Sequence, residues 1–178
     1  MRRLVPAPAL LSLVALLMLP AATGCSGGPD EAEREDGAIV SPGAVDVFGV
    51  RVGDCLDLEA SEATAAQITD LAAVPCAQPH RHEVFHVGEV TGFDVYPGPS
   101  ELSSASDGMC LGAFEDYVGV PYLDSDVQFT YLYPSLASWQ DEEDREVVCI
   151  LVSTSPQTRS LAAPGAEAGD GTVPATGS

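Results

Sequence analysis

The sequence predicts an α+β domain in which a small antiparallel sheet packs against one helix and is held by two disulfides. Three observations lead to this prediction. Several segments between residues 46 and 153 alternate apolar and polar side chains with a period of two, which is typical of strands. One further segment repeats its apolar residues at helical spacing. Four cysteines are spread over the same region, where a small exported domain would use them as disulfides.

The first 24 residues have the layout of an export signal. Two arginines precede an apolar run over residues 4–19, and small residues lead up to Cys25. The ending Ala-Thr-Gly-Cys resembles a bacterial lipobox, in which the cysteine sulfur takes a diacylglyceryl group and the chain is cut just before it. We therefore predict a lipoprotein signal peptide over residues 1–24 and lipidation of Cys25. A plain secretory signal and an uncleaved membrane anchor are the alternatives.

Two segments that flank the domain lack the large apolar residues that a core requires. Residues 25–45 are rich in Gly, Pro, Glu and Asp, and we expect a disordered tether there. Residues 154–178 consist mainly of small and polar residues, and we expect a disordered tail. The folded domain is accordingly predicted over residues 46–153, a length that can bury a modest core.

Five segments of this domain have the character of strands. They are residues 47–58, 71–74, 82–91, 126–133 and 147–152. The fourth segment alternates most cleanly, with Val127, Phe129, Tyr131 and Tyr133 on one face. The last is apolar on both faces, which predicts a central strand that is covered on both sides.

One apolar stripe predicts a helix between the third and fourth strands. Its members recur at i, i+3, i+4, i+7 and i+8, and they are Cys110, Ala113, Phe114, Tyr117 and Val118. Ser103 or Ser106 can cap the start of this helix, and Gly119 can end it.

An even set of four cysteines remains once Cys25 carries a lipid. The four contain no Cys-x-x-Cys pair, so a structural zinc site would lack its usual local chelate. Sequence alone allows three disulfide pairings among them. We favour Cys110–Cys149, which would join the helix to the central strand, and Cys55–Cys76, which would then link the first two strands. Each closure would contribute about 3–4 kcal/mol to stability.

The residues around these cysteines form a recognisable set of motifs. They are Gly53-Asp54-Cys55, Val74-Pro75-Cys76 with Pro79-His80 and Glu83-Val84 after it, Cys110, and Trp139 ahead of Asp144-Arg145 and Cys149. Over about residues 50–152 this set resembles the exported domain named septum formation, from high-GC Gram-positive bacteria. Glu143 departs from the pattern, because glycine usually precedes Asp-Arg there. The resemblance implies a link to division or envelope growth and no particular reaction.

All three histidines lie between residues 80 and 86. His82 and His86, with Glu83, match the H-E-x-x-H signature of zinc proteases, which needs a helix to bring both imidazoles to one ion. On the predicted strand these histidines are about 13 Å apart, so we interpret the match as chance and predict no metal site. His80 and His82 could share a metal across about 6.6 Å, but a third ligand is not identifiable. We favour an imidazole of His80 that bonds to the backbone, with Glu83 as its partner.

Five residues are candidates for an interaction site, each with a structural alternative. They are Asp54, His80, Glu83, Trp139 and Arg145. Asp54 is expected to cap a turn, and Arg145 to pair with a carboxylate. The acidic run 141–144 lacks the spaced ligands of a calcium loop, so we interpret it as a solvated hairpin tip. Trp139 is equally consistent with a partner contact and with core packing.

Composition and charge limit the function further. The chain has 27 carboxylates, seven arginines and no lysine, which excludes a catalytic lysine and a generally basic, nucleic-acid-binding surface. Nucleophile motifs are absent from the sequence, and we predict no cofactor. The hypothesis is a non-catalytic extracytoplasmic lipoprotein that contacts the cell membrane through its anchor and binds an envelope or division protein. The alternatives are a metal-dependent hydrolase that uses the His80–His86 cluster and a ligand-sensing accessory domain.

Overall fold

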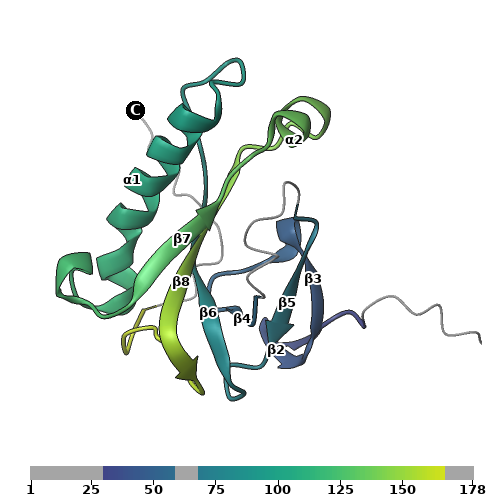
Figure 1. Ribbon diagram of the computed structural model, residues 1–178. Helices are drawn as coiled ribbons and strands as arrows, with labels where there is room; N and C mark the ends of the chain where they lie inside the picture. The colour runs from purple at the N-terminus through teal and green to yellow at the C-terminus, as the bar shows by residue number, and fades with distance from the viewer. Residues whose placement is uncertain (1–29, 59–67, 167–178) are drawn as a thin grey trace, which may run out of the picture.

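The computed structural model describes residues 30–58 and 68–166 (Figure 1). Within them, the predicted α+β class is confirmed, since an antiparallel sheet carries a long packed helix. Both predicted disulfides are present, with Cα atoms 5.2 Å apart in Cys55–Cys76 and 5.5 Å apart in Cys110–Cys149. The predicted signal peptide, Cys25 and residues 167–178 lie outside the described residues.

The main sheet has six strands in the order β3-β5-β4-β6-β8-β7, and every neighbouring pair is antiparallel. Their bounds in that order are Gly43–Asp46, Asp70–Val74, Cys55–Leu56, His80–Glu89, Glu146–Gln157 and Gln128–Leu132. A separate hairpin pairs β1 (Glu33–Glu35) with β2 (Ala38–Ser41). The helices are α1 (Pro99–Val118) and α2 (Leu136–Asp141), with 3-10 turns η1 (Val47–Gly49) and η3 (Tyr122–Asp124).

Strand β8 is the covered central strand that the sequence predicts. Its apolar run is buried on both faces, because neighbouring side chains along a strand point in opposite directions. Val147, Cys149 and Leu151 enter a first core beneath α1. Val148 and Ile150 enter a second core on the other face, together with residues of β2, β3, β4 and β5.

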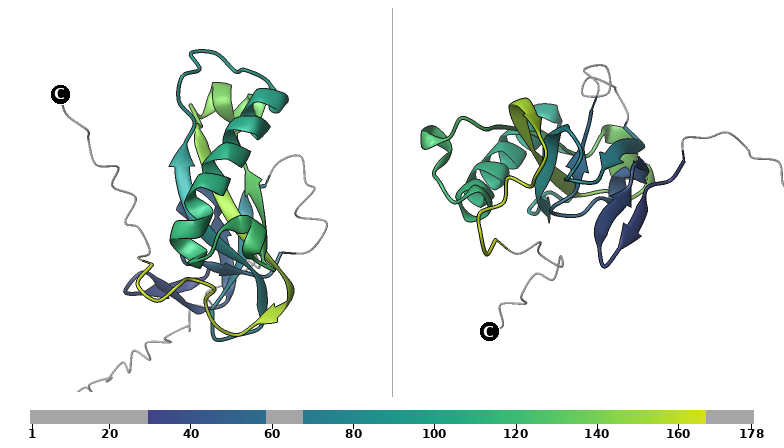
Figure 2. Two further views of the ribbon diagram at one scale, coloured as in Figure 1. Left: turned by 90° about the vertical axis from the view of Figure 1, so that its left-hand side faces the viewer. Right: turned by 90° about the horizontal axis from the view of Figure 1, so that it is seen from below.

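Helix α1 lies along one face of the sheet, and Figure 2 places it at the opposite end of the molecule from the β1–β2 hairpin. The predicted stripe is confirmed, since Cys110, Phe114 and Tyr117 are buried. Gly119 ends the helix in the left-handed conformation at φ 83°, as predicted. The predicted start is wrong, because the helix begins at Pro99. Proline suits a first turn, where its missing N–H has no partner to lose.

The tether prediction is wrong for residues 30–45, which form β1, β2 and most of β3. A strongly polar composition hides two apolar side chains at positions that face the sheet. Ile39 of β2 and Val45 of β3 are both buried in the second core. Hydrophobic burial at a few alternate positions therefore outweighs the average composition of the segment.

The first predicted strand, 47–58, is also mostly wrong. The turn η1 replaces its beginning, because the Asp46 side chain accepts a hydrogen bond from the Phe48 N–H at 2.9 Å and caps it. Gly53 then turns the chain at φ 94°, a conformation that glycine adopts without a steric penalty. Only Cys55–Leu56 remains as the short strand β4.

The C-terminal boundary lies further along the chain than predicted. Strand β8 continues to Gln157, and residues 158–166 are described as well, so the predicted disordered tail is wrong over 154–166. The N–H groups of Leu161 and Ala163 bond to the Glu83 carboxylate and the Tyr117 carbonyl. These bonds and apolar contacts to the first core hold the segment on the domain.

Candidate functional site

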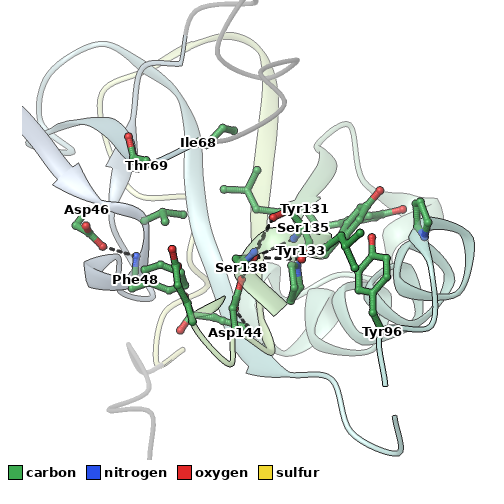
Figure 3. A pocket seen from close by; sticks show the side chains of 17 residues that line it. Asp46, Phe48, Ile68, Thr69, Tyr96, Tyr131, Tyr133, Ser135, Ser138 and Asp144 are labelled. Atoms are coloured by element: carbon green, nitrogen blue, oxygen red, sulfur yellow. Dashed lines mark hydrogen bonds between the residues drawn. The ribbon is translucent and has the colours of Figure 1, made fainter. Parts of the chain in front are cut away.

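A cavity of about 600 Å³ opens between η1 on one side and the segment from the end of β7 through α2 on the other. We call it the acidic-aromatic cleft, after the residues that line it. Its aromatic members are Phe48, Tyr96, Tyr131 and Tyr133, and its carboxylates are Asp46, Glu142, Asp144 and Glu146. Figure 3 shows Asp46 and Phe48 on one side of the cavity, with Tyr133, Ser135 and Tyr96 on the other.

The η1 wall presents an exposed aromatic ring. One carboxylate oxygen of Asp46 accepts a hydrogen bond from the Phe48 N–H, and this bond fixes the turn. The Phe48 side chain then stands at the rim with 51% of its surface exposed. An exposed ring beside a cavity is available for contact with a ligand, unlike the buried rings under α1.

The α2 wall is held by a capping box and a buried tryptophan. Ser135 and Ser138 cap each other's backbone N–H groups at the start of α2. Trp139 is only 4% exposed and meets the Tyr96 ring edge-on at 5.8 Å. Arg145 stacks on the indole with its Cζ 3.4 Å from the ring centroid, and it donates to the carbonyl oxygens of Trp139 and Asp144. These contacts give the cleft a rigid wall.

The carboxylates of the cleft are close enough to influence each other. Asp144 accepts from the Ser138 hydroxyl and from the Glu146 N–H, both at 2.8 Å. Burial, and then the charges of Asp144 and Glu89, raise the pKa of Glu146 to about 6. Among the residues that the structure places around this cavity, none is Lys, Arg or His. The charged groups that line the cavity are therefore all carboxylates, while Arg145 stacks on Trp139 and is not a lining residue. This lining favours a cationic occupant.

The five predicted candidates separate into two places. Trp139 and Arg145 support the cleft wall, with Trp139 in the core and Arg145 stacked on it. Arg145 bonds to carbonyl oxygens, and the only ion pair among the described residues is Arg34–Asp54, so the expected carboxylate partner of Arg145 is not found. Asp54, His80 and Glu83 are all buried, away from that cavity.

Asp54 has the structural role that the sequence predicts. Its carboxylate accepts the Arg51 N–H at 2.8 Å within the turn, and both its oxygens accept from Arg34 at 2.6 Å. This bond raises the pKa of Arg34. Sequence reasoning missed Arg34 because it lies in the segment expected to be a tether.

Glu83 and His80 are buried to 0% and 1% exposure. Glu83 accepts from the Tyr117 hydroxyl at 2.7 Å, the Ser160 hydroxyl and the Leu161 N–H. Burial and the charge of Glu83 raise the pKa of Tyr117. The His80 Nδ1 lies 2.8 Å from the Gln78 carbonyl oxygen, which confirms the predicted backbone bond. Its Nε2 is without a hydrogen-bond partner in the described chain, so the predicted bond to Glu83 is wrong.

The H-E-x-x-H segment lies on strand β6, as predicted, and not on a helix. The Nδ1 of His82 accepts the Leu58 N–H at 3.3 Å. Burial lowers the pKa of both His82 and His86. The described residues bring a different set within metal-binding range, since ligand atoms of Cys55, His80 and Glu83 lie within 4.8 Å of one another.

Comparison with known proteins places the chain in a family. Residues 52–172, more than half of the chain, match the family described as septum formation. The chain belongs to the septum formation family. An uncharacterized membrane protein of Mycobacterium tuberculosis, found in strains CDC 1551 and H37Rv, is 29% identical to this septum formation protein over 123 residues. That match covers 64% of the chain and 26% of the relative, so the chain spans about a quarter of the length of its curated relatives.

No solved structure matches this septum formation protein. The family match includes all four disulfide cysteines and the α2 wall of the acidic-aromatic cleft, whereas the η1 wall with Asp46 and Phe48 precedes residue 52. In the described part of the chain, no helix has the length and apolar character needed to cross a bilayer.

Proposed function

We propose that this septum formation protein is an extracytoplasmic binding module of the cell envelope, tied to the membrane by a lipid on Cys25. The export signal and its lipobox support this location. Family membership and the membrane-protein relatives support a septum-related role in the envelope. In this proposal the domain binds a protein partner and catalyses no reaction.

The observation that carries the binding proposal is the lining of the acidic-aromatic cleft. Four carboxylates and four aromatic rings surround about 600 Å³, and the described lining contributes no basic side chain. A cation entering the cleft would meet both the carboxylate charge and the negative faces of the rings. The proposed occupant is therefore a positively charged segment of a partner protein.

The edge of the sheet offers such a segment a backbone to pair with. Strand β7 is the last strand of the sheet, and among the described strands none pairs with its outer edge. Tyr131, Leu132 and Tyr133 run from this strand into the cleft. An extended peptide could add to β7 through main-chain hydrogen bonds while its basic side chains reach the carboxylates.

The H-E-x-x-H pair of the metal-dependent hydrolase, His82 and His86, receives no support from its geometry. His82 and His86 lie on a strand, where they cannot chelate one ion in the manner of the helical signature. The acidic-aromatic cleft contains no histidine among its described lining residues.

The binding proposal is tested by titrating the folded domain with matched peptides. An extended peptide with alternating arginine and apolar residues is compared with one that has glutamate at the arginine positions. We expect saturable NMR shifts at Phe48, Tyr133 and Glu142 for the basic peptide alone. Added salt should weaken this binding, because the attraction is between partly exposed charges.

The double variant Glu142→Gln/Glu146→Gln supplies the test of position. It should weaken binding of the basic peptide at least about tenfold, which corresponds to about 1.4 kcal/mol. The matched control is Glu115→Gln, a carboxylate on the outer face of α1 that does not line this cleft. Equal binding of both peptides, or equal losses in both variants, would contradict the proposal.

The anchor is tested separately by intact-mass spectrometry of the mature protein purified from membranes. We expect a chain that begins at Cys25 and carries a diacylglyceryl mass on it. An unmodified Cys25, or an N-terminus still at Met1, would exclude the lipid anchor and leave the cleft proposal to its own test.

A further inference from the structure

The buried environment of the Cys55–Cys76 disulfide contains two side chains that are typical metal ligands. Ligand atoms of Cys55, His80 and Glu83 lie within 4.8 Å of one another, and all three residues are buried. Cys76 is bonded to Cys55 and is partly exposed. The chain thus gathers two sulfurs, an imidazole and a carboxylate at one point inside the domain.

One ring nitrogen of His80 is ready to coordinate. Its Nδ1 lies 2.8 Å from the Gln78 carbonyl oxygen, so Nδ1 carries the proton and donates it. That tautomer leaves a lone pair on Nε2, which is buried and has no hydrogen-bond partner within the described residues. A backbone carbonyl that fixes one nitrogen while the other faces the metal is the usual arrangement of a metal-bound histidine.

Glu83 is held in the same way by groups outside the cluster. Tyr117 and Ser160 donate to its Oε1, and the Leu161 N–H donates to its Oε2 at 2.7 Å. Oε2 therefore keeps a lone pair for a metal. The carboxylate is fully buried, and in the described residues the only ion pair is Arg34–Asp54, so no basic side chain balances the charge of Glu83. A divalent cation would supply that balance.

We propose that opening the Cys55–Cys76 disulfide converts this cluster into a site for Zn²⁺ or a similar borderline-soft divalent ion. Cys55, His80 and Glu83 are its ligands, and Cys76 lies next to the fourth position. A dithiol reductant gives two electrons and two protons to the disulfide, which becomes two thiols while the reductant becomes a cyclic disulfide. The ion then replaces the proton of the Cys55 thiol. The Cys55 sulfur cannot be part of the disulfide and bind a metal ion at the same time, so the two states exclude each other.

The required movements are small. Ligand atoms in a tetrahedral zinc site are about 3.3–3.8 Å apart, given metal–ligand bonds of about 2.0–2.3 Å. One ligand atom of each of the three residues lies within 4.8 Å of the others, which exceeds the spacing of a tetrahedral site by about 1 Å. The proposed site does not require Cys76, Cys110 or Cys149 as a ligand. The Cys110–Cys149 disulfide can therefore remain closed.

The experiment uses Cys76→Ser, which frees the Cys55 thiol without any reductant. The folded variant is titrated with Co²⁺, whose thiolate complexes absorb in the near ultraviolet, and then with Zn²⁺ in competition. We expect one equivalent of metal and a thiolate-to-cobalt band. Cys55→Ser, the matched control, frees the other cysteine and should bind at least about tenfold more weakly. Oxidised wild-type protein should give no band.

Two further variants locate the imidazole. In the Cys76→Ser background, His80→Ala should weaken metal binding at least about tenfold, whereas His82→Ala should leave it unchanged. If Cys76→Ser does not fold, wild-type protein with only the Cys55–Cys76 bond reduced replaces it, and circular dichroism confirms its fold. Absence of the thiolate band in both folded forms, equal binding by Cys55→Ser, or equal losses in the two histidine variants would overturn the proposal.

Discussion

Single side chains in this protein behave very differently according to how their charge is balanced. Asp54 has a bidentate partner in Arg34, whereas the fully buried Glu83 has three neutral donors and no basic partner among the described residues. Glu146, which lines the cleft, is influenced by the carboxylates of Asp144 and Glu89. Substitutions at these positions therefore report on distinct physical effects.

Glu146→Gln is predicted to stabilise the domain above about pH 6. Burial and nearby carboxylates raise the folded-state pKa of Glu146 from 4.5 to about 6, so the unfolded chain ionises first as the pH rises. The contribution of Glu146 to the free energy of unfolding is therefore fully present below pH 4.5 and is lost as the pH rises through about 6. We expect a gain of about 1 kcal/mol at pH 7 in urea unfolding, reduced by the partial exposure of the group.

The control for this prediction is Glu142→Gln, an exposed carboxylate of the same cleft. It should change stability much less at pH 7. If only Glu146→Gln loses the change in unfolding free energy between pH 4.5 and 6, the raised pKa belongs to Glu146. Equal effects of the two variants would refute this.

Tyr117→Phe is predicted to destabilise the domain by about 1–3 kcal/mol, because it removes one of the three donors to a buried carboxylate. Chemical unfolding at pH 7 measures the change. Tyr122→Phe is the comparison, since the Tyr122 ring packs on Phe114 and the Tyr117 ring on Phe85 of the same aromatic cluster. A similar small loss in both variants would show that the Tyr117 hydroxyl contributes little.

At the scale of elements, helix α1 depends on how its C-terminal end meets the last described segment of the chain. Gly119 closes the helix at φ 83°, and a Cβ built there would come 2.8 Å from the Cβ of Ala163. Gly112 lies within the same helix, where an added Cβ meets nothing within 4 Å. The two glycines therefore have opposite predicted responses to alanine.

Gly119→Ala should destabilise the domain by about 1–2 kcal/mol, because an L-residue is strained in the left-handed conformation and its Cβ also collides with Ala163. Gly112→Ala should stabilise it by about 0.5–1 kcal/mol through helix propensity. Thermal unfolding of both variants measures the difference. If both substitutions shift the thermal unfolding midpoint in the same direction, the predicted requirement for glycine at the end of α1 is wrong.

Elements with a strong periodic pattern could be predicted from the sequence, and those fixed by local capping could not. The apolar stripe was sufficient to predict α1 and its buried face. The run that is apolar on both faces was sufficient to predict β8 as a covered strand. By contrast, η1 depends on one Asp46 bond and α2 on a reciprocal pair of serines, signals too short to stand out. The acidic-aromatic cleft lies between these two elements, so its aromatic members Phe48 and Tyr96 were missed.

For the whole molecule, the described domain includes strands that precede residue 46, since β1 already starts at Glu33. Removal of residues 30–46 is predicted to destabilise the domain by at least about 3 kcal/mol, since it exposes the second core where Ile39 and Val45 are buried and leaves Asp54 without Arg34. Soluble forms that start at residue 30 and at residue 47 should differ accordingly in urea midpoint. Equal urea midpoints would show that residues 30–46 contribute nothing to stability, as expected of a tether.

The position of these early strands also limits a distance. With a lipid on Cys25, the chain from that cysteine to Asp30 can reach at most about 18 Å when fully extended. A tether of twenty flexible residues would have let the domain search a wide volume above the bilayer. If Cys25 carries the proposed lipid, Asp30 lies within that distance of the anchor, and the positive partner segment proposed above would have to lie close to the membrane surface to reach the acidic-aromatic cleft.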